Sequence, residues 1–182
     1  MAASIALPGP HRRITIGQGD AMASTALDVS FTTVLGSCIA VCLHDRGAAV
    51  GGMNHFLLAD YAPLAGEDPQ LLSRYGVHAM ELLINAMMHR GGRRDHLKAR
   101  IYGGASMRDG LGNIGERNTE FARTFLRREG IPVLGEEVGG NAARRIEFLP
   151  ALGRARCKSI VAAPPIPVRI SPPPITGEVE LF

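Results

Sequence analysis

The chain has 182 residues, of which 46% are hydrophobic and 20% charged, a composition that suits one folded domain and excludes wholesale disorder. Aromatic residues make up only 5% and tryptophan is absent, so little material is available for stacking nucleic-acid bases. The net charge of +3 comes with arginines scattered along the chain rather than gathered in one stripe. This distribution favours an acidic protein surface as partner and argues against nucleic acid.

The cysteine count and the hydropathy pattern indicate the cellular compartment in which the protein works. The chain has an odd number of cysteines, the three residues Cys38, Cys42 and Cys157, and they form no disulfide framework. The N-terminal residues lack the basic segment and apolar core of a secretory signal, and no stretch reaches the roughly 18 apolar residues of a membrane span. We therefore expect a cytoplasmic protein without membrane insertion, whose thiols stay reduced.

The first third of the chain predicts strands. Residues 1–12 are expected to form a flexible leader, and residues 18–28 a polar connection. Strands are predicted over 13–17, 29–35, 39–45 and 49–58, the last two joined as a hairpin around Arg46-Gly47. A loop rich in proline and glycine follows.

Two helices alternate with further short strands in the rest of the chain. Apolar residues recur at helical spacing over 70–89, before Gly91-Gly92, and over 113–129, before Gly130. Strands are predicted over 98–102, 131–138, 144–149 and 155–161, and six prolines after Ala162 predict an extended tail over 163–182. The pattern predicts a single layered α/β (α+β) domain over 13–162, with helices flanking mostly antiparallel or mixed sheets.

A cysteine and a histidine are the candidate catalytic pair. Cys38 ends the segment Leu35-Gly36-Ser37-Cys38, and His55 ends Gly51-Gly52-Met53-Asn54-His55. A turn centred between Arg46 and Gly47 pairs Cys38 directly with His55, with Cβ atoms roughly 4.5–5.5 Å apart, whereas a bulge at Gly51-Gly52 would leave them diagonal. An imidazole beside a thiol can take its proton and generate a nucleophilic thiolate. Gly36 permits a sharp turn that would direct backbone amides, such as that of Ser37, at an oxyanion.

Each of these residues also has an ordinary structural explanation. Free cysteines and neutral histidines often simply pack in a core, and Thr32 and Thr33 are β-branched strand formers. Asn54 would face the opposite side of a regular strand from His55. Zinc is a further alternative, with ligand types at Cys38, Cys42, His44 and His55, but Cys38 and Cys42 would stand roughly 13 Å apart along one strand.

A glycine-rich segment, Tyr102-Gly103-Gly104, lacks the spacing of a phosphate-binding loop. Its glycines are expected to let a loop pass close to another backbone. No metal or cofactor is predicted.

Five segments, in order and spacing, resemble the CheD family of chemoreceptor glutamine deamidases, and the match spans roughly residues 13–161. They are Leu35-Gly36-Ser37-Cys38, Gly51-Gly52-Met53-Asn54-His55, Tyr102-Gly103-Gly104-Ala105-x-Met107, Asn113-Ile114-Gly115-x-x-Asn118 and Gly139-Gly140-x-x-x-Arg144.

The resemblance implies hydrolysis of glutamine side-chain amides in methyl-accepting chemotaxis receptors, and in some members hydrolysis of glutamyl methyl esters. The family's catalytic cysteine, histidine and threonine fall on Cys38, His55 and Thr32. Gly36, Ser37 and Asn54 are further candidates for substrate or oxyanion contacts, and residues 61–74 and 103–113 for the rim of the substrate groove.

The family's fold resembles the catalytic domain of the cytotoxic necrotizing factor toxins, and a CheC-type phosphatase is a partner of many members. The main alternative is a regulatory binding module that retains the cleft without turnover.

Overall fold

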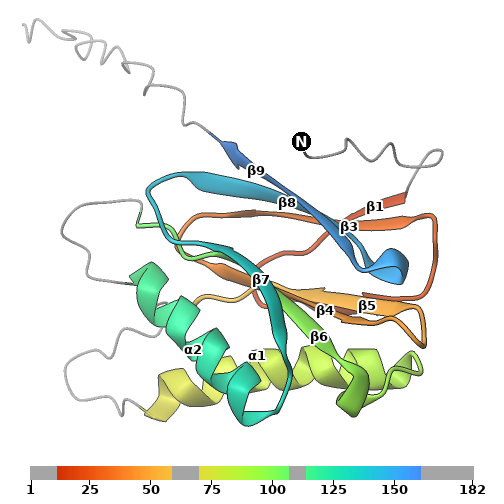
Figure 1. Ribbon diagram of the computed structural model, residues 1–182. Helices are drawn as coiled ribbons and strands as arrows, with labels where there is room; N and C mark the ends of the chain where they lie inside the picture. Colours follow the sequence, from red (N-terminus) through yellow and green to blue (C-terminus); the bar gives the residue numbers. More distant parts are fainter. Residues whose placement is uncertain (1–11, 59–69, 107–113, 161–182) are drawn as a thin grey trace, which may run out of the picture.

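The computed structural model describes residues 12–58, 70–106 and 114–160 (Figure 1). The predicted leader and proline-rich tail lie almost wholly outside the described residues. The predicted rim does so in large part, since residues 59–69 and 107–113 are not described.

The described strands form two mixed sheets. The first has the order β1-β3-β8-β9, and β1 alone runs parallel to its neighbour. Its strands are β1 (Arg12–Thr15), β3 (Val29–Leu35), β8 (Ala143–Leu149) and β9 (Arg154–Ile160), with the 3₁₀ turn η3 (Pro150–Leu152) between the last two. In β3 the residues alternate between buried and more exposed, so one face of this sheet is directed inward.

The second sheet has the order β2-β5-β4-β6-β7, with only β6 and β7 parallel. Its strands are β2 (Ala21–Ser24), β5 (Val50–Asn54), β4 (Ile39–Asp45), β6 (Lys98–Gly103) and β7 (Val133–Val138). A short 3₁₀ turn, η2 (Arg94–His96), precedes β6. Because β4 and β5 are buried on both faces, the second sheet is the middle layer of the molecule.

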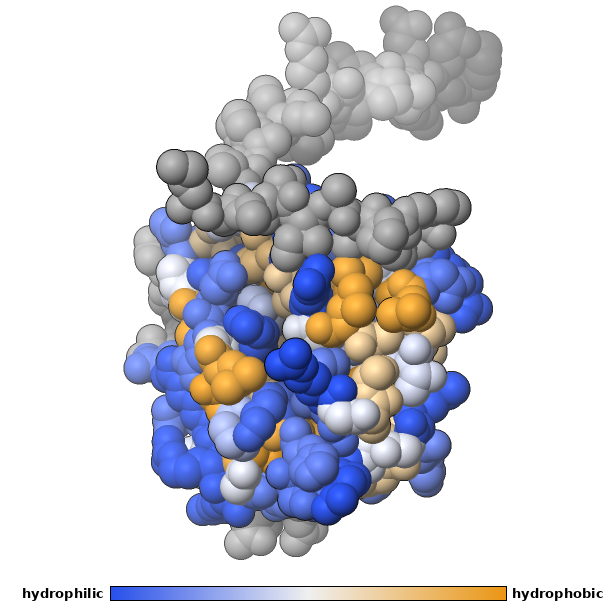
Figure 2. All heavy atoms as spheres, turned by 45° about the vertical axis from the view of Figure 1, so that its right-hand side comes forward, coloured by the Kyte–Doolittle hydropathy of each residue, from blue (hydrophilic) through white to orange (hydrophobic). Residues whose placement is uncertain are grey.

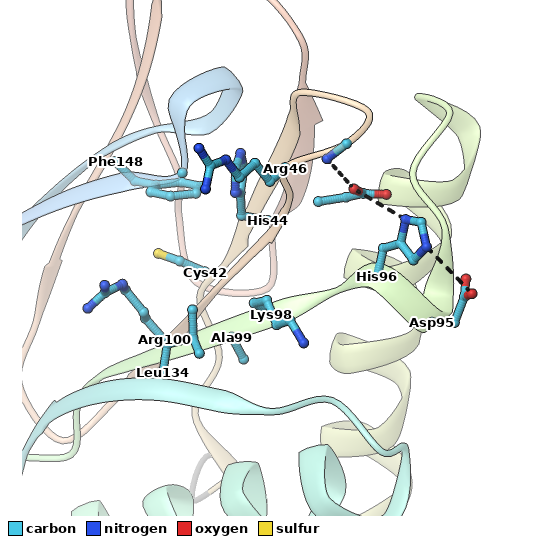
Figure 3. Close-up of a pocket in the computed structure, with 13 residues that line it drawn as sticks. Cys42, His44, Arg46, Asp95, His96, Lys98, Ala99, Arg100, Leu134 and Phe148 are labelled. Carbon is cyan, nitrogen blue, oxygen red and sulfur yellow. Dashed lines mark hydrogen bonds and ion pairs between the residues drawn. The ribbon is translucent and has the colours of Figure 1, made fainter.

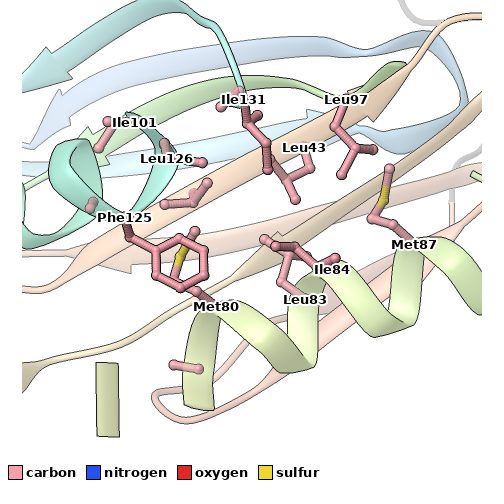
Figure 4. Packing of buried hydrophobic residues seen from close by; sticks show 14 of the residues in the cluster. Leu43, Met80, Leu83, Ile84, Met87, Leu97, Ile101, Phe125, Leu126 and Ile131 are labelled. Atoms are coloured by element: carbon pink, nitrogen blue, oxygen red, sulfur yellow. The ribbon is translucent and has the colours of Figure 1, made fainter. Parts of the chain in front are cut away.

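Two helices complete a three-layer arrangement. Helices α1 (Gln70–His89) and α2 (Ile114–Arg128) cover one face of the second sheet, and the first sheet covers the other (Figure 1). Alternate residues of β4 therefore enter two different cores. Ile39, Val41 and Leu43 pack against the helices, in the cluster seen in Figure 4, whereas Ala40 and Cys42 face the first sheet.

The predicted layered α+β domain with mixed sheets and flanking helices is confirmed. Gly130 follows α2 with φ +67°, the left-handed conformation expected of a glycine after a helix. The polar connection predicted over 18–28 is wrong at Ala21–Ser24, which forms β2 beside β5. This strand gave no signal because alanine has low β-propensity and four residues show little periodicity. The likeness to the necrotizing factor domain stays a prediction.

The face seen in Figure 2 is largely hydrophilic, and its apolar residues form small separate patches. Leu82 of α1 is 39% exposed, whereas Met80, Leu83, Ile84 and Met87 of the same helix are fully buried. None of the described helices has the length and hydropathy needed to span a membrane.

Candidate active site

The loop Gly36–Cys38 connects β3 to β4 and carries the candidate nucleophile. Each of its three carbonyl groups accepts a hydrogen bond, two from the segment directly after β6 and one from α2. Ala105 N–H donates to Gly36, the Asn118 side-chain amide to Ser37, and Gly104 N–H to Cys38, all at 2.8 Å. The loop is thereby fixed in one conformation, with its carbonyl groups engaged.

Close backbone packing explains the glycines of the next motif. Gly103 has φ +108°, and a Cβ atom there would lie 2.1 Å from the carbonyl oxygen of Cys38. A Cβ atom on Gly104 would lie 2.3 Å from Oγ1 of Thr119. The prediction that these glycines let a loop pass close to another backbone is confirmed.

Asn118 joins the nucleophile loop to α2. Its side chain is fully buried, its Nδ2 donates to Ser37 O at 2.8 Å, and its Oδ1 accepts from Leu58 N–H at 3.0 Å. Asn118 belongs to one of the five segments that carry the family resemblance, but nothing in the helical pattern indicated that it supports the cysteine loop.

Replacing Asn118 with leucine is expected to lower the free energy of unfolding by about 2–4 kcal/mol, because two buried backbone groups lose their partner. The deamidation rate should also fall, because the Ser37 carbonyl is no longer held. Urea unfolding measures the first effect. Arg117→Ala, at the exposed neighbouring position, is the control, and equal stabilities of the two variants would contradict the supporting role of Asn118.

His55 lies directly after β5, and its pairing differs from the predicted one. The observed register pairs Cys42 with Met53, and Ile39 bridges to Phe56. Continued by one residue, this register places Leu57 opposite Cys38, so the direct pairing of Cys38 with His55 was wrong by two residues. The cause is the turn, which has four residues between Asp45 and Val50 and is centred between Gly47 and Ala48, one residue later than predicted. Asp45 Oδ1 accepts from two of the N–H groups of this turn.

A shift of two residues leaves the side-chain face unchanged. Met53 and Cys42 both face the first sheet, and Cys38 packs in the same cluster. His55 therefore shares the inter-sheet face with Cys38 as its diagonal neighbour, a relation that places Cα atoms roughly 7–8 Å apart in antiparallel sheets.

Among the described residues, the imidazole of His55 finds hydrogen-bond partners through one ring nitrogen only. Nδ1 lies 2.9 Å from Thr33 Oγ1 and 3.4 Å from the carbonyl oxygen of Ile16. The Thr33 hydroxyl also lies 2.8 Å from Ile16 O, which can only accept, so the single hydroxyl proton goes there. Thr33 Oγ1 then accepts from Nδ1–H, and this network assigns the tautomer with a lone pair on Nε2.

The environment of the ring favours its neutral form. His55 is 8% exposed, and Nε2 is buried without a hydrogen-bond partner among the described residues. Burial lowers the pKa of His55 below its ordinary value, although the Ile16 carbonyl and the Asp20 carboxylate act in the opposite direction. A neutral imidazole with a free lone pair is the form that a general base requires.

Two residues predicted for the site are not brought to it. Thr32 lies on the other face of β3, half-buried, and its hydroxyl donates to Ile146 O at 2.9 Å in the first sheet. The Asn54 side chain faces the helices, where Oδ1 accepts from Val41 N–H and Nδ2 donates to Ala79 O. The direct neighbour of His55 is Thr33, which the sequence did not distinguish from an ordinary strand residue.

One of the hollows of the described structure lies away from the candidate nucleophile. A cavity of about 400 Å³ opens at the far end of β4 from Cys38, with Cys42, His44 and Phe148 in its lining (Figure 3). Burial raises the pKa of the Cys42 thiol far above its ordinary value, so this cysteine is an inert core residue. Within the described ranges, no group of three or more His, Cys, Asp or Glu side chains could hold a metal ion, so the zinc alternative has no site there.

Comparison with known proteins identifies the family. Residues 57–159 match the family model described as CheD chemotactic sensory transduction. Proteins named probable chemoreceptor glutamine deamidase CheD are similar over nearly the whole chain. The one from Zymomonas mobilis is 51% identical, covering 94% of this chain and 93% of its own. The one from Acidiphilium cryptum is 45% identical, covering 97% of both.

Similarity to solved structures is more distant. The Bacillus licheniformis hypothetical protein YfiH superposes with a TM-score of 0.44 at 13% identity, over 65% of this chain and 50% of that one. The Neisseria meningitidis protein NMB0706 does so with a TM-score of 0.38 at 15% identity, over 67% and 52%. Since the family model covers more than half of the chain and the relatives match nearly all of it, the chain belongs to the CheD family.

Proposed function

We propose that this protein is a glutamine deamidase that converts side-chain amides of methyl-accepting chemotaxis receptors into glutamates and releases ammonia. The observation that carries the proposal is 51% identity over 94% of the chain to a relative named probable chemoreceptor glutamine deamidase. Cys38 and His55, on one face at one end of the inter-sheet layer, supply residue types suited to this chemistry.

In the proposed mechanism His55 Nε2 takes the proton of the Cys38 thiol. The thiolate forms a bond to Cδ of the substrate glutamine, and the carbonyl electron pair moves onto oxygen. The imidazolium then protonates the amide nitrogen, the C–N bond breaks and ammonia leaves. Water, deprotonated by His55, attacks the thioester, and the thiol is restored as glutamate departs.

Backbone amides of the nucleophile loop are the proposed donors to the oxyanion. What supports this role is that the carbonyl groups of Gly36, Ser37 and Cys38 are all engaged by Ala105, Asn118 and Gly104. A loop fixed in this way needs no rearrangement as negative charge develops. The family resemblance implies a catalytic role for Thr32; that role and the role of Asn54 remain predictions, to be tested by substitution.

The proposed setting follows from the substrate. The enzyme would act in the cytoplasm on an exposed helix of a receptor bundle, with a CheC-type phosphatase as a candidate regulator. A glutamyl methyl ester can enter the same sequence of steps, with methanol as leaving group in place of ammonia.

Mass spectrometry of a receptor's cytoplasmic fragment tests the function. Incubation with the protein should raise the mass of particular glutamine peptides by about 1 Da, the difference between amide and acid, with one ammonia released per site. Unchanged receptor peptides after incubation with folded protein would refute the proposal.

A further inference from the structure

The side-chain amide of Gln18 lies against the candidate nucleophile. The Cys38 thiol donates to Gln18 Oε1, with Sγ and Oε1 3.7 Å apart. Gln18 is exposed and stands between β1 and β2, twenty residues before the cysteine. The contact therefore joins two segments that are separate in the sequence, at an exposed position.

The turn that carries Gln18 is bonded to the backbone of His55 on both sides. Gly19 N–H donates to His55 O at 2.8 Å, and His55 N–H donates to Asp20 O at 3.1 Å. Within the turn, the Asp20 carboxylate accepts from Gly17 N–H at 2.9 Å. Gly19 has φ +89°, a conformation that favours glycine. Gln18 is thus held in register with the general base, unlike a loosely placed surface side chain.

We propose that Gln18 is a catalytic residue of the deamidase, and that its Nε2–H donates to the oxyanion formed on the substrate amide. The inference rests on the proposed function, since it assigns a role in that reaction. A carboxamide carries an acceptor at one end and donors at the other, and a half-turn about χ3 exchanges them.

This exchange of acceptor and donor ends matches the change in hydrogen bonding at Cys38 during the reaction. In the resting site the thiol is a donor, and it faces the acceptor Oε1. Once Sγ has bonded to the substrate carbon and the carbonyl electron pair has moved to oxygen, the group that needs a partner is an acceptor. Nε2–H then supplies a neutral donor beside the backbone amides, and Gln18 itself forms and breaks no covalent bond.

Gln18→Leu is the test, because leucine keeps much of the volume and removes the amide. We expect kcat for glutamine hydrolysis to fall about 10²–10³-fold with KM changed less than about twofold, as for loss of one oxyanion donor. In Gln18→Glu, kcat should fall further than in Gln18→Leu, because a carboxylate offers no donor and repels the oxyanion. Thr15→Val, an exposed change on β1 three residues earlier, is the control. Thermal unfolding should be the same for all variants.

A second measurement uses a receptor peptide in which an aldehyde replaces the glutamine carboxamide. Reversible addition of Cys38 gives a tetrahedral hemithioacetal, and Gln18→Leu should raise its inhibition constant about 10–100-fold. Unchanged or increased kcat in Gln18→Leu, or a rise in KM alone, would overturn the oxyanion role while leaving the deamidase function intact. A wild-type protein that neither hydrolyses glutamine nor adds the aldehyde would refute the proposed function, and the role of Gln18 with it.

Discussion

Replacing Cys38 with alanine should reduce ammonia release from receptor by at least about 10³-fold, to the background of the assay. No other described residue near His55 carries a nucleophile of comparable strength. Cys38 is only partly buried, and the hydrogen bonds that hold its loop, from Gly104 N–H to the Cys38 carbonyl and from Asn118 Nδ2 to the Ser37 carbonyl, do not involve the sulfur. The variant should therefore unfold at the same urea concentration as the wild type, and the loss can be assigned to chemistry.

Cys157→Ala is the matched control for this experiment. Cys157 is also partly buried, but burial and a hydrogen bond to Glu137 raise the pKa of its thiol to about 12, so it is a poor nucleophile at neutral pH. Iodoacetamide should accordingly modify Cys38 first and stop turnover in step with that modification. Full activity of folded Cys38→Ala protein would refute the thiol mechanism, even if the receptor peptides were deamidated.

The parts of the site that follow local patterns could be predicted from the sequence. The strand that begins directly after Cys38, the strand that leads to His55 and the face that both residues share all depend on a period of two, which a short sequence reveals. The strand register could not be predicted from this pattern, because the length of the turn depends on how Asp45 caps it. An error of an even number of residues preserved the face, so the conclusion that the pair shares a side was correct even though the direct pairing was not.

The contacts that support the pair could not be predicted, because they join segments far apart in the chain. Asn118 reaches Ser37 from α2, and Gln18 reaches Cys38 from the turn before β2. Thr33 and Thr32 are adjacent and chemically identical, so only the packing of β3 against β5 decides which hydroxyl meets the imidazole. Spacing within a motif carries no information about that packing.

Thr33→Val should lower kcat about 100-fold, whereas Thr32→Val should change it less than about threefold. Valine has nearly the shape of threonine but cannot accept from the Nδ1–H of His55. Without that acceptor the ring can adopt the other tautomer, with the proton on Nε2, where it cannot act as the base. The hydroxyl of Thr32 donates to the backbone of β8 instead, and its loss leaves the imidazole unaffected.

The pH profile separates this positioning role from a merely structural one. In the wild type, burial lowers the pKa of His55, so activity should be lost on acidification only below the ordinary value of about 6.5. Thr33→Val removes an acceptor that favours the imidazolium, so the acid limb should move to still lower pH while the plateau falls. Thr33→Ser keeps the hydroxyl, so the height of the plateau and the position of the acid limb should both return to those of the wild type. If Thr32→Val showed the larger loss and shifted the acid limb, the imidazole would be positioned by Thr32, as the family resemblance implies, and the role of Thr33 would be refuted.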